Sequence, residues 1–273
     1  MNTLKYVILG ICLILIGYSC EDLIDVNLNS SSQSIIIEGK ITSENKPAEV
    51  IISRSVDYFT TGAIPKVSNA KVHITTDKAF TEQLKQFDPG HYLGYQTAGF
   101  PGESFKLDVE VDGVTYSART SMPMLVVIDT LIASYSEKTL VSEAGYEVYM
   151  NYTDPPNEEN FYKIEVYRNG KLFPDETTIR LRSDKYSDGK QVSVGLNGFQ
   201  SNGLRFAMND RILVKLYSMN KEVYEHLKTL KAITTNGFGG SSSTPANPIT
   251  NLSNGAFGYF GAFAVNEMYL EIH

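Results

Sequence analysis

Residues Ser104–Thr120, SFKLDVEVDGVTYSART, give the clearest indication of fold in this sequence. The dipeptide Asp112-Gly113 favours a two-residue hairpin turn, because both residue types tolerate the positive φ angles that such turns require. Before the turn, Asp108 and Glu110 alternate with apolar residues, which is the period of a strand with one buried face. The stretch therefore predicts an antiparallel hairpin with strands at Ser104–Val111 and Val114–Thr120.

The rest of the N-terminal half shows the same pattern, in which short runs of β-branched or aromatic residues are separated by turn residues. Further strands are predicted at Ile35–Thr42, Glu49–Ser55, Asn69–Thr76 and His91–Thr97. So many short strands in a segment of this length predict an immunoglobulin-like β-sandwich over residues 35–123.

The C-terminal half predicts a second, antiparallel β domain over residues 125–273. Its strands are expected at Val126–Ser134, Tyr146–Tyr152, Phe161–Arg168, Thr177–Arg182, Gln191–Gly195, Asp210–Ser218, Ala256–Ala264 and Val265–Ile272. One amphipathic helix is predicted at 221–233, because Val223, Leu227 and Leu230 share a helical face and Asn220 is a good N-cap. Residues 234–254, rich in Gly, Ser, Asn and Pro, predict a long loop that is either mobile or functional.

Composition narrows the class of protein. The chain has 273 residues, of which 42% are hydrophobic, so it can form a packed core and is not expected to be disordered. The 24 Lys and Arg residues against 31 Asp and Glu residues give a net charge of −7. That balance argues against a nucleic-acid partner, which requires clustered positive charge.

The N-terminus predicts a lipoprotein signal peptide at residues 1–19. Lys5 precedes an apolar run of 13 residues, Tyr6–Tyr18, and a helix of that length covers about 20 Å, less than the ~30 Å of a bilayer core. Small residues then lead to Cys20, an arrangement that resembles a bacterial lipobox. We expect acylation of Cys20 and a flexible tether over residues 20–34; the alternative is an ordinary signal peptide with an incidental cysteine.

The second cysteine, Cys12, lies inside the apolar run and would be removed with it. Two cysteines supply neither a disulfide framework nor a cysteine-based zinc site. The four histidines, His73, His91, His226 and His273, lack the spacing of a metal site. His226 lies one turn after Glu222, which favours a helix-surface ion pair, and His91 begins a strand, where packing is expected.

Two groups of carboxylates are candidates for chemistry. Asp108, Glu110 and Asp112 predict a solvated sheet face, with weak calcium binding as the alternative. Asp154, Glu158 and Glu159 occur in the segment Asp154–Asn160, DPPNEEN, and predict a solvated acidic turn, with the carboxylate dyad of a hydrolase as the alternative. No nucleophile elbow or phosphate-binding loop is present. We therefore expect no catalytic residues, no metal site and no cofactor.

Several short pieces together resemble a family of Bacteroidetes outer-membrane lipoproteins, domain-of-unknown-function family 4249. They are Cys20-Glu21, Ile24-Asp25-Val26, Ile37-Glu38-Gly39, Ile41-Thr42, Ile52-Ser53-Arg54-Ser55, Asp57-Tyr58-Phe59, Asn69-Ala70-Lys71-Val72, Pro89-Gly90-His91-Tyr92, Gly113-Val114-Thr115-Tyr116-Ser117-Ala118, Ile128-Asp129-Thr130-Leu131, Ala246-Asn247-Pro248-Ile249-Thr250-Asn251 and Gly255-Ala256-Phe257-Gly258-Tyr259-Phe260. The resemblance implies a transthyretin-like first domain. It also implies that the gene lies beside one that encodes a TonB-dependent receptor. It supplies no catalytic residues.

The resemblance places the protein in the outer membrane, lipid-anchored and in a position where it can be displayed at the cell surface. The expected function is non-enzymatic: an accessory to a TonB-dependent transporter, in nutrient capture or receptor assembly. The alternatives are a structural or adhesive surface protein and, less favoured, a secreted carboxylate-dependent hydrolase. The expected partners are outer-membrane lipid and a TonB-dependent receptor, and the ligand, whether small molecule, peptide or glycan, stays open.

Two further features bear on recognition. Asp129-Thr130-Leu131 matches the short pattern used for O-glycosylation in Bacteroidetes, which makes Thr130 a candidate site; the alternative is an ordinary strand entry. The 17 tyrosines suit a wet recognition surface, because a phenol combines an apolar ring with a polar tip. Residues 234–254 and the tyrosine-rich faces are the candidate contact surfaces.

Overall fold

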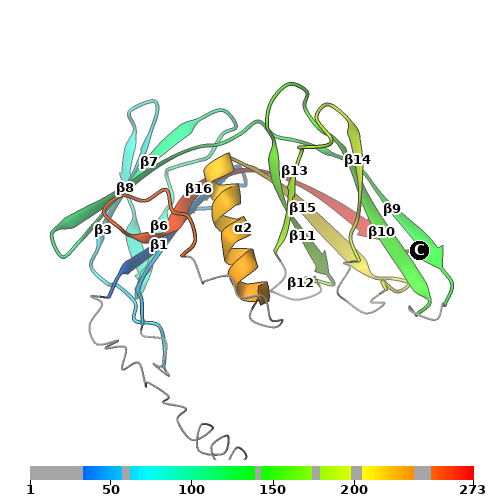
Figure 1. Ribbon diagram of the computed structural model, residues 1–273, viewed down its shortest axis with the longest axis horizontal. Helices are drawn as coiled ribbons and strands as arrows, with labels where there is room; N and C mark the ends of the chain where they lie inside the picture. Colours follow the sequence, from blue (N-terminus) through cyan, green and yellow to red (C-terminus); the bar gives the residue numbers. More distant parts are fainter. Residues whose placement is uncertain (1–32, 57–61, 139–142, 174–178, 198–204, 237–246) are drawn as a thin grey trace, which may run out of the picture. The chain divides into compact units, whose positions relative to one another are not determined.

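The computed structural model describes residues 33–56, 62–138, 143–173, 179–197, 205–236 and 247–273. In these residues the chain is mainly β, with one helix, and the predicted fold class is confirmed (Figure 1). The predicted signal peptide, Cys20 and nearly all of the predicted tether lie outside the described residues.

The first sandwich packs a four-stranded sheet against half of a nine-stranded one. The four-stranded sheet has the order β4-β3-β7-β8, and the facing strands are β16 (Phe257–Glu271), β1, β2, β6 and β5. Their bounds are β1 Ile35–Thr42, β2 Ala48–Arg54, β3 Lys71–Thr76, β4 Thr81–Gln83, β5 Lys85–Asp88, β6 His91–Gly94, β7 Ser104–Val111 and β8 Val114–Ser121. Alternate residues of both sheets, such as Ile37 and Leu107, meet in one apolar core. The strands β4 and β5 were not predicted.

The hairpin predicted from Ser104–Thr120 is present. Strand β7 pairs with β8 in antiparallel register, from the Ser104–Ser121 pair to the Val111–Val114 pair. Asp112 and Gly113 between them have φ angles of 51° and 79°, as the turn chemistry requires. The odd-numbered residues of β7 point into the core and its even-numbered residues face outward.

The second sandwich packs the other half of the nine-stranded sheet against a three-stranded sheet of order β14-β10-β9. Its strands are β9 Ile128–Ser136, β10 Gly145–Thr153, β11 Phe161–Arg168, β12 Lys171–Leu172, β13 Arg180–Ser183, β14 Gln191–Gly195 and β15 Arg211–Met219. The second core includes Val148, Tyr162 and Val214. β12, a two-residue strand after the Asn169-Gly170 turn, was not predicted.

Strand β16, Phe257–Glu271, connects the two sandwiches. Its first part runs parallel to β1, from Ile36–Phe257 to Thr42–Phe263, and its second part runs antiparallel to β15, beginning at the Ser218–Ala264 pair. The two strands predicted at 256–264 and 265–272 are therefore one continuous strand with two successive partners (Figure 1). The first core accordingly includes residues of β16 as well as residues from the predicted N-terminal domain.

The helix α2, Lys221–Asn236, begins where predicted and extends three residues past the predicted end at Ile233. The Asn220 side chain caps it, because its Oδ1 accepts a hydrogen bond of 3.1 Å from the Val223 backbone N–H. Val223 and Leu227 pack on Phe263 and on neighbouring side chains of β11 and β15. Among the described residues, no helix is both long and apolar enough to cross a membrane.

The end of the predicted 234–254 loop covers the free edge of β8. Ser253 N–H donates to the Ser117 carbonyl at 2.8 Å, and Asn254 Nδ2 donates to the Thr115 carbonyl at 2.6 Å. Asn251 bonds both backbone groups of Phe260, with Nδ2 to O at 2.9 Å and N to Oδ1 at 3.0 Å. This segment therefore protects a sheet edge; residues 237–246 of the loop lie outside the described residues.

Candidate functional site

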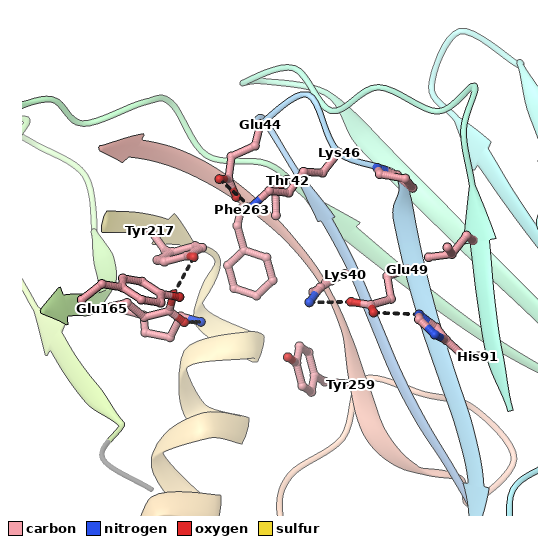
Figure 2. A pocket seen from close by; sticks show the side chains of 14 residues that line it. Lys40, Thr42, Glu44, Lys46, Glu49, His91, Glu165, Tyr217, Tyr259 and Phe263 are labelled. Atoms are coloured by element: carbon pink, nitrogen blue, oxygen red, sulfur yellow. Dashed lines mark hydrogen bonds and ion pairs between the residues drawn. The ribbon is translucent and has the colours of Figure 1, made fainter. Parts of the chain in front are cut away.

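A cleft of about 450 Å³, which we call the junction cleft, opens where β16 changes partner (Figure 2). It is lined by Lys40, Thr42, Glu44, Lys46, Pro47, Glu49, His91, Leu93, Lys163, Glu165, Tyr167, Tyr217, Tyr259 and Phe263. In Figure 2 the side chains of β1, β2 and β6 form one wall and those of β11 and β15 the other, with Phe263 and Tyr259 of β16 between them. A volume of this size is typical of small-ligand sites.

The first wall is a row of charged side chains on three neighbouring strands. Lys40 Nζ lies 2.5 Å from Glu49 Oε2, and His91 Nε2 lies 2.8 Å from Glu49 Oε1. Burial raises the pKa of Glu49, but the hydrogen bonds and charges of Lys40 and His91 outweigh it, so the pKa lies below its ordinary value. Glu49 is therefore an ionised hydrogen-bond acceptor near neutral pH.

The second wall is centred on Glu165. Its carboxylate accepts hydrogen bonds from Lys163 Nζ at 2.8 Å, Tyr167 Oη at 2.9 Å and Tyr217 Oη at 2.7 Å. Burial opposes ionisation of Glu165, yet the charge of Lys163 and these donors hold its pKa below the ordinary value. Burial and the bond to Glu165 raise the pKa of Tyr167 to about 12, so this phenol stays protonated.

The turn between β1 and β2 holds the two walls together. Ser43 N–H donates to the Phe263 carbonyl at 2.9 Å, and Ser43 Oγ accepts from Val265 N–H at 2.8 Å. The next residue, Glu44, accepts from Lys215 Nζ of β15 at 2.6 Å and from Lys46 Nζ at 2.9 Å. Ser43 thus fixes the β1–β2 turn to β16, and Glu44 fixes it to β15.

The chemistry available in the cleft is that of polar recognition. Glu44, Glu49 and Glu165 each lie against at least one lysine, and each has a pKa below its ordinary value. A general acid requires the opposite shift, a carboxyl that stays protonated near neutral pH. Ionised carboxylates, ammonium groups and phenols are suited instead to hydrogen bonds with a ligand.

Of the four histidines considered from the sequence, only His91 lines the cleft. His73 lies on β3 opposite Asp108 in the β3–β7 pair, and His273 is exposed at the C-terminus. The expectation for His226 was wrong. It is 5% exposed, its ring packs against Tyr259 at 4.9 Å, and its Nδ1 lies 2.5 Å from the Ile249 carbonyl oxygen.

His226 is buried because it belongs to the inward face of α2. It lies at i+3 from Val223 and precedes Leu227, so the same helical spacing that buries those residues buries the imidazole. Burial lowers its pKa, although the Ile249 carbonyl and the more distant charge of Glu38 act in the other direction.

The carboxylates near the first hairpin face outward and carry ion pairs. Asp108 accepts from Ser117 Oγ at 2.6 Å and lies 2.7 Å from Lys106 Nζ. Glu110 pairs with Lys71 and Asp112 with Arg54. The side chains of Asp108 and Glu110 are therefore part of a charged outer sheet face, and Asp112 belongs to the turn.

The expectation of a solvated acidic turn was wrong for Asp154. Its side chain is 0% exposed and accepts a hydrogen bond of 2.6 Å from Tyr162 Oη. It lies near Asp184 and Asp188 of the loop between β13 and β14 rather than with Glu158 and Glu159, and one oxygen from each of the three aspartates falls within 4.8 Å of the others. Burial raises the pKa of Asp154, as do the two neighbouring aspartates, against the bond from Tyr162.

Three carboxylates so arranged are oxygen ligands of the kind that Ca²⁺ prefers. All three already accept hydrogen bonds from loop backbone: Asp184 from Asn160 N–H at 2.8 Å, Asp188 from Asn157 N–H at 2.8 Å and Asp154 from Gly189 N–H at 3.4 Å. The group is thus satisfied in part by protein donors that hold the β10–β11 and β13–β14 loops together. Absence of a metal site stays a prediction from the sequence.

Thr130, the candidate glycosylation site, lies exposed on β9, which is an edge strand of the three-stranded sheet. Its Oγ1 accepts a hydrogen bond of 3.0 Å from Asn151 Nδ2 on β10. Its position is accessible, and glycosylation at Thr130 stays a prediction.

No single residue of the cleft was predicted from the sequence to bind a ligand, and for His91 only a packing role was expected. A signal exists in β11, where Lys163, Glu165 and Tyr167 alternate with the core residues Ile164 and Val166. Such alternation shows that these polar side chains share one face. It does not show that β1 and β2 supply the opposite wall, because that follows from the distant pairing of β1 with β16.

Comparisons with known proteins give the family but no activity. A search of curated proteins found no match. Among solved structures, one described as "Cytokine receptor complex - Crystal form 1A" matches with 8% sequence identity, covering 86% of this chain and 94% of the other. Its TM-score of 0.26 is too low to support an argument about fold or function. The model of the family described as "Domain of unknown function (DUF4249)" matches residues 21–268, and the chain therefore belongs to that family.

Proposed function

We propose that this protein is a non-enzymatic outer-membrane lipoprotein, anchored through acylated Cys20, that holds a ligand in the junction cleft and assists a TonB-dependent transporter. The observation that carries the binding role is the cleft itself, with three ionised carboxylates, their lysine partners and several phenols converging on about 450 Å³. The anchor and the receptor rest on the N-terminal sequence and on the neighbourhood that the family resemblance implies.

The hydrolase alternative is supported less well by the described residues. A carboxylate pair for hydrolysis needs one carboxyl of raised pKa within reach of substrate. Asp154 has a raised pKa, but its side chain is fully buried beside Tyr162. The carboxylates that substrate could reach in the cleft have lowered pKa values.

The anchor is tested by replacing Cys20 with Ala in the full-length chain. The variant should move from the membrane fraction to the soluble fraction, with Cys12→Ala as the matched control that leaves fractionation unchanged. A Cys20→Ala protein that still sediments with outer membranes would refute the lipid anchor.

The receptor is tested by affinity purification from detergent-solubilised membranes under mild crosslinking. The proposal expects a TonB-dependent receptor among the retained proteins, and repeated absence of any such receptor would contradict it. Retention of matrix or partner-cell glycoproteins alone would favour the adhesive alternative.

A further inference from the structure

A second hollow lies beside the junction cleft on the same sheet. This outer hollow, of about 840 Å³, is lined by Lys46, Tyr167, Asn169, Gly170, Asn209, Arg211, Ile212, Leu213, Lys215 and Tyr269. It shares Lys46 and Tyr167 with the junction cleft. The two hollows therefore meet at these residues.

The strand register shows that the two hollows follow one sheet face. Tyr167 of β11 lies opposite Leu213 of β15, which lies opposite Tyr269 of β16. Two strand spacings separate Tyr167 from Tyr269, about 10 Å. Along β11, Glu165 and Lys163 continue the same face into the junction cleft. The surface thus forms a groove with tyrosines along its length.

The backbone of β15, in the middle of this groove, offers no free edge to an extended peptide. β15 is paired with β11 on one side and β16 on the other, whereas β16 is paired with β1 from Phe257 to Phe263 and with β15 from Ala264 to Glu271. Peptides that bind sheets do so mainly through main-chain hydrogen bonds at a free edge. Over β15, recognition of a ligand can therefore use side chains only.

Most charges of the groove are paired, which favours an uncharged ligand. In the outer hollow, Lys46 and Lys215 both lie against Glu44, and Arg211 adds a further positive charge. In the junction cleft, Lys40, Lys46 and Lys163 face Glu49, Glu44 and Glu165 in three close pairs. An anionic ligand would meet the carboxylates, and a cationic one would meet the lysines. A neutral ligand with many hydroxyl groups can donate to the carboxylates and accept from the ammonium groups without breaking a pair.

We propose that the junction cleft and the outer hollow together bind a neutral oligosaccharide laid across the outer face of the nine-stranded sheet. Tyrosine rings supply apolar surface for sugar rings, and Glu165, Lys163 and their neighbours supply hydrogen bonds to hydroxyl groups. This inference rests on the proposed function only in that the cleft holds a ligand, and it does not depend on the receptor.

The test uses the full-length lipoprotein in detergent and isothermal titration with defined sugars. The probes are the neutral hexasaccharides of α-1,4-glucan, β-1,4-glucan, β-mannan, β-xylan and chitin, with the matching disaccharides. A hexagalacturonate and a set of neutral hexapeptides serve as the acidic and peptide probes. We expect at least one neutral hexasaccharide to bind at least about tenfold more tightly than its disaccharide, a difference of about 1.4 kcal/mol.

Tyr269 allows a matched pair of variants, because its side chain is 69% exposed and Tyr186, outside both hollows, is 83% exposed. Tyr269→Ala should weaken hexasaccharide binding about three- to tenfold, and Tyr186→Ala should leave it within about twofold. Thermal unfolding should confirm that both variants are folded.

The inference is overturned if no neutral hexasaccharide binds, if the acidic or peptide probes bind more tightly, or if Tyr269→Ala has no larger effect than Tyr186→Ala. Equal affinity for disaccharide and hexasaccharide would refute the extended groove. Co-purification of a receptor without sugar binding would support the proposed accessory role and refute this inference. Sugar binding without a receptor would support this inference and contradict the accessory role.

Discussion

The pair Glu44–Lys215 should be the strongest ionic link between the two walls of the junction cleft. Lys215 Nζ lies 2.6 Å from Glu44 Oε1, and the two side chains are 10% and 16% exposed. Burial lowers the pKa of Lys215, but its bonds to Glu44 and Glu267 outweigh this and raise it overall. The ammonium group is therefore held charged by its carboxylate partners.

The size of this link follows from its burial. A hydrogen bond to a charged group contributes about 1.5–3 kcal/mol to stability, whereas an exposed ion pair contributes about 0.2–1 kcal/mol. Glu44 makes one contact of each kind, because Lys46, its second partner, is 58% exposed at 2.9 Å. The Glu44–Lys215 coupling should thus exceed the Glu44–Lys46 coupling by about 1–2 kcal/mol.

Two double-mutant cycles measure the difference through urea unfolding at pH 7 and 0.15 M salt. One combines Glu44→Gln with Lys215→Met, and the other combines Glu44→Gln with Lys46→Met, so the same carboxylate is tested against two lysines. Interaction energies that are equal, or a Glu44–Lys215 energy below about 0.5 kcal/mol, would refute the reasoning, because burial would then have no effect on the coupling.

Three further outcomes are expected. Asn251→Ala should lower the free energy of unfolding, measured by urea titration, by about 2–5 kcal/mol. The reason is that the buried N–H and C=O of Phe260 lose their hydrogen-bond partner. A loss below about 1 kcal/mol would show that water replaces the Asn251 side chain. Stability should fall as the pH drops from 7 to 5, because burial lowers the pKa of His226 in the folded chain, so that the unfolded chain, with an ordinary pKa of about 6.5, binds the proton first. His226→Gln should flatten this slope, and an unchanged slope in that variant would contradict the reasoning. Asp154→Asn should melt at or above the wild-type temperature at pH 7.5, with the gain shrinking toward pH 4, because a raised carboxyl pKa costs stability once the group ionises; a lower melting temperature would indicate that ionised Asp154 is held by a cation.

Local patterns were sufficient to predict most of the elements. The Asp112-Gly113 turn gave the β7–β8 hairpin with its register, and Asn220 gave the start of α2. These features depend on turn chemistry and side-chain periodicity over a few residues, which one sequence contains in full. Short strands such as β4 were missed because three residues are too few to display a period.

Long-range pairing determined what could not be predicted. The parallel pair of β1 and β16 joins residues more than 200 positions apart, and no local pattern specifies it. That pairing places Lys40 and Glu49 opposite Glu165 across the cleft. For the same reason the burial of Asp154 could not be predicted. Tyr162 contacts it from β11, and Asp184 and Asp188 lie near it in the β13–β14 loop.

Two of the sequence pieces that resemble the family, Ile37-Glu38-Gly39 and Gly255–Phe260, meet at this pair, and their contacts explain their glycines. Gly258, with φ of 98°, lies so close to the backbone of Ile37 that a Cβ atom would overlap its carbonyl oxygen. Gly39 lies against the ring of Phe260. The Asn251 side chain bonds the backbone N–H and C=O of Phe260. Gly39, Gly258, Asn251 and Phe260 line neither hollow, whereas Thr42, His91 and Tyr259, which also belong to pieces that resemble the family, line the junction cleft. The binding specificity of a family member should therefore be sought in its counterparts of these three residues and of the groove residues on β11, β15 and the β1–β2 turn.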